Sequence, residues 1–160
     1  MHSLKLSFVK SGKFPVLFQK ADFVIVSKEA VLGIIEVKTK KQLKEFVEFP
    51  NKLYKGNEYY CPPMASDEIN TFIPSKNPGY EFCESKQFLA YKDNKLVGRI
   101  AGIINYAHIE RQNKKQIRFA RFDAIDDIEV TKALFNAVKE YGKDKKMDEM
   151  NQIMVEFAKI

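Results

Sequence analysis

The sequence predicts an α+β fold, and three observations in its middle third carry that prediction. Phe88–Asn105 contains two apolar runs separated by turn-forming residues, which is typical of a β-hairpin. Gln116–Asp126 is a third apolar run and is expected to form another strand. An amphipathic helix then begins at Asp126 or Asp127 and runs to about Tyr141. Antiparallel strands that lead into a helix predict a sheet with a helix packed on it.

The predicted hairpin turns at Asp93 and Asn94, because both side chains tolerate positive φ and can bond their own backbone. Gly98 and Gly102 lie inside the return strand. A glycine in a strand marks either a kink without a ligand or a place where something packs close to the backbone. The residue pattern leaves both interpretations open.

The predicted helix after the third strand has one apolar face. Asp126 or Asp127 is a candidate N-cap, and Glu129 places negative charge in the first turn. Residues at spacings of three and four form the face: Val130, Ala133, Leu134, Ala137, Val138 and Tyr141. We expect Gly142 to end the helix, because glycine is favoured just after a C-terminus.

Composition and charge favour one globular domain. The chain has 160 residues and a formal net charge of +6, which is spread along the sequence and is not a nucleic-acid footprint. Cys61 and Cys83 form no C-x-x-C pair, and His2 and His108 lie far from both, so no metal site is expected. No stretch approaches the ~20 apolar residues of a membrane span. These features predict a cytoplasmic protein with reduced thiols and no membrane or nucleic-acid partner.

A first candidate constellation lies near the N-terminus. Short strands are expected over Leu4–Val9, Ala21–Val26 and Gly33–Lys40, and they carry Asp22, Glu36 and Lys38. This spacing resembles the PD-(D/E)xK nuclease core, which would imply a divalent metal such as Mg²⁺ held by the two carboxylates. A surface strand with an exposed Glu and Lys explains the same residues.

Residues 40–55 predict a helix, with Thr39 as N-cap and a break at Pro50. Residues 56–82 contain four prolines and are expected to be mostly loop. One short helix is expected inside this loop, capped by Ser66 or Asp67.

From about Ile34 onward the sequence resembles a known superfamily. The segments are EFVEFPNKLYKGNEYYCPPM, NPGYEFCESKQFLAYKDNKLVGRIAGIIN and RFARFDAIDDIEVTKALFNAVKEYGKDKKMDEM. They are similar to the N-terminal half of a longer bacterial family with the GNAT N-acetyltransferase fold. The resemblance covers about three quarters of the chain. It implies a mixed, mostly antiparallel sheet over residues 34–160, C-terminally incomplete, after an N-terminal extension of unknown role over residues 1–33.

The resemblance also implies an activity, the transfer of an acyl group from acetyl-CoA to an amine, without a metal. In this superfamily the pyrophosphate of CoA is held by backbone N–H groups at the start of the helix. Mapped here, the cofactor-binding residues are Ile125, Asp127, Ile128, Val130 and Thr131. The segment from Ile125 to Thr131 has no glycine, and it contains three acids, Asp126, Asp127 and Glu129. Each like charge near 4 Å costs on the order of 1–4 kcal/mol, so we expect weakened pyrophosphate binding.

Three residues are implied as catalytic candidates. Acyl transfer to an amine needs a general base and often a tyrosine acid. Asp123 and Asp126 lie near the end of the strand before the helix, and Tyr106 follows the preceding strand. Asp126 can equally be a helix cap, and Asp123 and Tyr106 can be ordinary loop residues.

Three functions therefore stay open. The first is an N-acetyltransferase-like protein acting on a small-molecule or peptide amine, which truncation and the missing pyrophosphate loop could leave inactive. The second is the Mg²⁺-dependent nuclease that uses Asp22, Glu36 and Lys38. The third is a non-catalytic binding module. The early end of the chain also predicts an exposed sheet edge and possible self-association.

Overall fold

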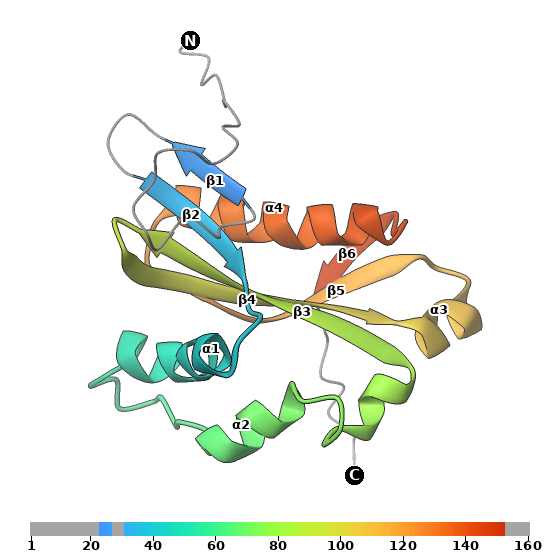
Figure 1. Cartoon of the computed structure of the whole chain (residues 1–160), viewed down its shortest axis with the longest axis horizontal. Coiled ribbons are helices and arrows are strands. Elements are labelled where there is room, and N and C mark those ends of the chain that lie inside the picture. The colour runs from blue at the N-terminus through green and yellow to red at the C-terminus, as the bar shows by residue number, and fades with distance from the viewer. Residues whose placement is uncertain (1–22, 27–30, 153–160) are drawn as a thin grey trace.

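A computed structural model describes residues 23–26 and 31–152, which form one six-stranded sheet with helices on both faces (Figure 1). The strands are β1 Phe23–Val26, β2 Val31–Glu36, β3 Cys83–Lys92, β4 Lys95–Asn105, β5 Gln116–Ala124 and β6 Glu149–Gln152. The helices are α1 Lys40–Leu53, α2 Ala65–Thr71, α3 Tyr106–Gln112 and α4 Ile128–Asp144, and a short 3₁₀ helix, η2, spans Pro78–Glu81.

The sheet has the order β1-β2-β3-β4-β5-β6. Neighbours from β1 to β5 pair antiparallel, whereas β5 and β6 pair parallel. A parallel pair needs a crossover, and α4 supplies it. This topology confirms the predicted mixed, mostly antiparallel sheet and the α+β class.

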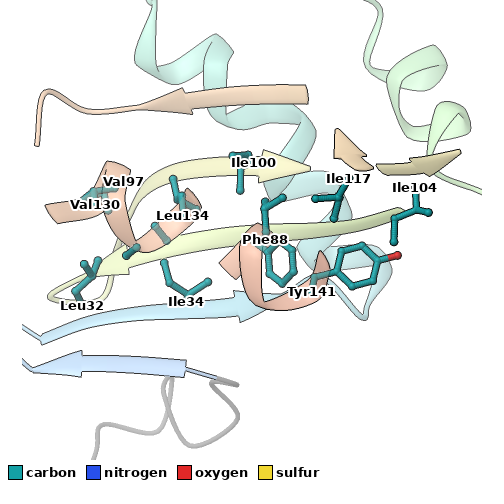
Figure 2. Close-up of a cluster of buried hydrophobic side chains, with 13 residues drawn as sticks. Leu32, Ile34, Phe88, Val97, Ile100, Ile104, Ile117, Val130, Leu134 and Tyr141 are labelled. Carbon is teal, nitrogen blue, oxygen red and sulfur yellow. The ribbon is translucent and has the colours of Figure 1, made fainter. Parts of the chain in front are cut away.

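The two faces of the sheet carry separate cores. α4 covers one face, and its side chains pack with strand residues in the cluster drawn in Figure 2. That cluster contains Leu32, Ile34, Phe88, Ala90, Val97, Ile100, Ile104, Ile117, Val130, Ala133, Leu134, Val138 and Tyr141. α1 and α2 lie on the opposite face (Figure 1), where Phe46 and Val47 of α1 pack on Leu89, Tyr91 and Ala101.

The predicted hairpin and its glycines are explained by this packing. Asp93 and Asn94 form the turn with φ of 50° and 64°, as predicted. Gly98 lies directly under α4, because a Cβ there would meet Leu134 Cδ1 at 2.8 Å. Gly102 is similarly close to Tyr141 and to Ile117. The strand glycines therefore mark the close approach of a helix.

α4 begins where predicted but ends later. Asp127 is the N-cap, and the apolar face is buried. Gly142 does not end the helix, so that prediction was wrong: α4 continues to Asp144 and Gly142 is buried within it. A Cβ at Gly142 would lie 2.9 Å from Ile117 Cγ2, so the glycine permits contact between α4 and β5.

α1 begins at its predicted cap but is not broken at Pro50. Thr39 and Gln42 form a capping box, which confirms the predicted start. The predicted break was wrong, because the helix passes through Pro50 to Leu53. Proline leaves the carbonyl four residues earlier, that of Phe46, without its helical donor. Arg99 Nη1 donates to this carbonyl at 2.7 Å.

Three further elements differ from the sequence expectations. The short helix in the 56–82 loop forms as α2, but its N-cap is Met64 and no side chain caps it, so Ser66 and Asp67 lie inside the helix. α3 has no counterpart among the predictions. β2 ends at Glu36, before Lys38.

The N-terminal expectations are only partly testable. Leu4–Val9 and Asp22 lie outside the described residues. Phe23–Val26 forms β1 and pairs with β2, so this part of the chain joins the sheet. A boundary between an extension and a domain at residue 33 stays a prediction.

Candidate functional site

Asp123 lies at the centre of a polar network between β5 and the helices on the α1 face. Its Oδ2 accepts from Arg99 Nε at 2.8 Å, and its Oδ1 accepts from the Tyr54 hydroxyl at 2.9 Å. Arg99 is only 5% exposed. These three residues, here called the Asp123 cluster, come from β5, β4 and the residue after α1.

The strand that carries Asp123 has a bulge beside it. Arg99 pairs with Asp123 and Ala101 pairs with Ala120, so two residues of β5 oppose one of β4. Arg121 lies in the bulge with φ of 51°. Its guanidinium donates to both carboxylate oxygens of Glu68 at 2.8 and 2.9 Å. The bulge is therefore tied to α2, on the same side as the Asp123 cluster.

Tyr54 enters the cluster as a proton-bearing phenol. Burial, then the hydrogen bond to Asp123, raises the pKa of Tyr54 above its ordinary value. Its ring lies 5.0 Å from that of Tyr60, whose hydroxyl donates to Asn51 Oδ1 at 2.7 Å. The phenol therefore remains a donor to Asp123 at neutral pH.

Sequence reasoning missed Tyr54 and Arg99. Arg99 had a visible signal, because it is the one charged residue in the apolar run VGRIAGII. A charge inside a buried strand needs a partner. Nothing in the local pattern indicates Tyr54, which reaches Asp123 across 69 positions of sequence.

The start of α4 is occupied by the chain's own carboxylate. Asp127 Oδ1 accepts from the backbone N–H groups of Glu129 and Val130 at 2.9 and 3.4 Å. Asp127 Oδ2 accepts from Lys92 Nζ at 2.7 Å. The hydrogen bond from Lys92 lowers the pKa of Asp127, and the backbone bonds act in the same direction. An anion therefore already caps this helix.

The predicted cofactor-binding residues lie around that cap. The N–H groups of Ile125, Asp127 and Thr131 bond the backbone oxygens of Val97, Ile125 and Asp127, respectively. The Val130 side chain is fully buried, whereas that of Ile128 is 63% exposed. A cofactor role for these residues stays a prediction.

Replacing Asp127 by asparagine tests the charge of the cap, because asparagine caps about as well as aspartate. The pKa of Asp127 is lower in the folded chain, so its ionised form stabilises the fold. We expect Asp127→Asn to cost about 0.5–1 kcal/mol at pH 7. The difference should vanish as the pH falls from about 4 through the lowered pKa. Urea denaturation at several pH values measures it.

The exposed neighbour provides the control for that experiment, since Asp126→Asn is expected to change stability by less than about 0.5 kcal/mol. A stability difference for Asp127→Asn that is the same at pH 7 and at pH 2.5 would contradict the ionic cap.

Tyr106, the third predicted catalytic residue, belongs to a different cluster. Its hydroxyl lies 2.5 Å from Glu84 Oε1, and Lys145 Nζ lies 2.8 Å from Glu84 Oε2. Burial alone would raise the pKa of Glu84, but these two hydrogen bonds hold it below its usual range. Tyr106 follows the end of β4, seven residues beyond Arg99, or about 23 Å along the strand. The structure therefore does not bring Tyr106 together with Asp123.

Glu36 and Lys38 lie on and just after β2. Glu36 Oε2 accepts from Lys86 Nζ at 2.9 Å and lies 3.9 Å from Lys38 Nζ. Glu36 and Lys86 border a cavity of about 190 Å³ between α4 and the strands. Within residues 23–26 and 31–152, no group of three His, Cys, Asp or Glu residues could hold a metal ion. Asp22 lies outside these residues.

No helix in the described part of the chain has the length and apolar character to span a bilayer.

No protein-family model matches the sequence. The chain is 37% identical over 106 residues to protein YghO of Escherichia coli, covering 66% of the chain and 27% of that protein. It is 28% identical over 116 residues to a bacterial ceramide synthase of Caulobacter vibrioides, covering 72% of the chain and 30% of that protein. The chain thus spans less than a third of the length of these relatives. Neither name refers to a nuclease.

Solved acetyltransferases have similar structures. An aminoglycoside N-acetyltransferase, AAC(6')-Iy in complex with CoA, has a TM-score of 0.57 at 15% identity, with 82% of each chain covered. A tandem GNAT protein from the clavulanic acid biosynthesis pathway has a TM-score of 0.55 at 10% identity, covering 72% of this chain and 34% of that one. A possible acetyltransferase from Clostridium difficile has a TM-score of 0.54 at 15% identity, covering 80% and 82%.

Proposed function

We propose that this chain, whose sheet and helices have the GNAT acetyltransferase fold, carries out acyl transfer to an amine. The fold rests on the structural neighbours. The observation that carries the proposal is the Asp123 cluster, in which a carboxylate beside the β5 bulge is held on both oxygens.

In this reaction the amine nitrogen bonds to the acyl carbon, the bond from that carbon to the leaving group breaks, and the nitrogen loses a proton. Asp123 is the proposed acceptor of that proton. Tyr54 and Arg99 orient its carboxylate, and both are donors to it. Tyr54, protonated at neutral pH, is the proposed source of a proton for the leaving group.

Acetyl-CoA is proposed as the donor on the strength of one structural neighbour, AAC(6')-Iy, which is described in complex with CoA and, in a second structure, with a CoA-containing bisubstrate analogue. The residues at the start of α4 do not fit a pyrophosphate there. The carboxylate of Asp127 already takes the N–H groups of Glu129 and Val130, and it would repel phosphate oxygens. A CoA donor would therefore need a different anchor in this chain.

A long-chain amine is the proposed acceptor. One relative is a ceramide synthase, and a ceramide is the amide of a fatty acid and a long-chain amino alcohol. Between α1 and α2 the chain exposes two large apolar side chains, Tyr59 at 89% and Met64 at 70%. Such side chains on the same side as Asp123 suit an apolar acceptor.

The test is amide formation from acetyl-CoA or a long-chain acyl-CoA and a long-chain amino alcohol, followed by mass spectrometry. We expect product with the wild-type chain and about 100-fold less with Asp123→Asn, because a positioned base contributes roughly 10²–10⁴-fold. Glu110→Gln, an exposed carboxylate on α3, is the matched control with unchanged activity. Equal rates for Asp123→Asn and the wild type would contradict the proposed base.

A non-catalytic GNAT-fold module is the second candidate, and the self-capped start of α4 favours it. In that case calorimetry shows no heat with acetyl-CoA and no amide forms.

Self-association through the sheet edge is a further proposal. Light scattering tests it, since a monodisperse monomer would oppose it.

A further inference from the structure

Arg99 donates a hydrogen bond to the backbone carbonyl in α1 that Pro50 leaves without a helical donor. Pro50 lies in α1 and has no N–H, so the carbonyl of Phe46 loses its helical donor. Phe46 is fully buried, so water does not replace the donor. An unpaired buried carbonyl is costly, and here Arg99 Nη1 lies 2.7 Å from it.

The same guanidinium holds Asp123. Arg99 Nε donates to Asp123 Oδ2 at 2.8 Å, and the guanidinium carbon lies 5.0 Å from the centre of the Phe46 ring. The planar group offers five N–H donors in fixed directions, so one side chain reaches the helix and the carboxylate together. A lysine ammonium at the end of a flexible chain does not reproduce that fork.

The contacts close into a ring. The N–H of Tyr54 donates to the oxygen of Pro50 at 2.8 Å, and the hydroxyl of Tyr54 donates to Asp123 Oδ1 at 2.9 Å. Asp123 is therefore joined twice to the part of α1 around Pro50, once through Arg99 and the Phe46 carbonyl and once through Tyr54. Two hydrogen-bonded paths therefore connect α1 to this carboxylate.

We propose that Arg99 is a positioning residue that supplies the hydrogen bond missing at Pro50 and thereby fixes Asp123 relative to α1. The part of this inference that concerns catalysis rests on the proposed function, whereas the link between Pro50 and Arg99 does not. An amine acceptor that contacts α1 would then be held at a fixed position relative to the proposed base, Asp123.

A double-mutant cycle between Pro50→Ala and Arg99→Met tests the link. Pro50→Ala restores an N–H that can donate to the Phe46 carbonyl, so the bond from Arg99 becomes redundant. We expect Arg99→Met to raise the unfolding equilibrium constant about tenfold more in the Pro50 background than in the Pro50→Ala background. Purely additive effects in urea denaturation would overturn the proposal.

The control cycle pairs Pro50→Ala with Arg121→Met. Arg121 also joins a strand to the helical layer, but it bonds Glu68 of α2 and not α1. Its effect should add to that of Pro50→Ala. If Arg99→Met does not fold, Arg99→Lys replaces it, because lysine keeps the charge and loses the fork.

A second measurement tests whether the charge of Arg99 lies beside the Tyr54–Asp123 pair. The Tyr54 phenol faces Asp123, Arg99 and Tyr60. The pKa of Tyr54 is raised overall, and the positive charge of Arg99 opposes part of that rise. In folded Arg99→Met the pKa of Tyr54, followed by NMR of the labelled ring, should rise, whereas in Pro50→Ala and Arg121→Met it should stay. An unchanged Tyr54 titration in Arg99→Met would overturn the proposal.

Activity, where present, adds a third result. Arg99→Lys should lower kcat more than it changes KM for the amine, because the carboxylate is misplaced while the acceptor surface is kept. The stability cycle and the Tyr54 titration need no turnover. Absence of amide formation therefore overturns the proposed function and leaves the proposal for Arg99 to be decided by those two measurements.

Discussion

Leu134→Ala lowers the free energy of unfolding by about 3–5 kcal/mol. Leu134 is fully buried in the core between α4 and the sheet, where Figure 2 shows it directed at the strands. Removing three carbons from such a site loses their transfer free energy and leaves a cavity that the surrounding sheet and helix fill only in part. Urea denaturation with an unchanged m value measures the loss.

Ile128 is the matched control, because it lies on the same helix and is 63% exposed. Ile128→Ala should change stability by less than about 0.5 kcal/mol. A loss below about 1 kcal/mol for Leu134→Ala would show that α4 does not cover the sheet in this register.

Gly98→Ala lowers the free energy of unfolding by about 1–3 kcal/mol, although it adds only a methyl group. The new Cβ would lie 2.8 Å from Leu134 Cδ1 and 3.2 Å from both Ala124 Cβ and Val130 Cγ1. Helix and strand must separate or repack, since the core offers no room. Thermal or urea denaturation of the single variant gives the cost.

The double variant Gly98→Ala and Leu134→Ala identifies the cause. The methyl group enters the space that the leucine leaves. The double variant should therefore be more stable, by about 1 kcal/mol or more, than the sum of the two single losses predicts. Val138 is not among the nearest neighbours of Gly98. Gly98→Ala combined with Val138→Ala should therefore be additive within about 0.5 kcal/mol. Additivity in both pairs would contradict the packing argument.

Local pattern was sufficient for the elements whose causes are local. The apolar residues of α4 recur on one face because a helix repeats every 3.6 residues, and this face is the one that is buried. The turn at Asp93 and Asn94 follows from two residues that tolerate positive φ. The Thr39 cap is likewise a contact between close neighbours.

Local pattern failed where the cause comes from another element. Pro50 predicts a break, but a strand residue distant in sequence, Arg99, supplies the missing donor. Gly142 predicts an end, but β5 requires a residue without a Cβ at that point of α4. Asp127 was proposed as a cofactor contact, and only the structure shows that Lys92 and two backbone N–H groups engage its carboxylate.

The sequence by itself determined the α+β class, the main hairpin and the helix after β5, and, through its resemblance, the fold. The tertiary structure alone decided which charged groups meet: Asp123 with Arg99 and Tyr54, and Tyr106 with a different carboxylate, Glu84. The physical reason is the distance along the sequence over which each interaction acts. Periodicity and capping act over a few neighbouring residues, whereas a hydrogen-bonded ion pair requires two strands and a helix to be in register first.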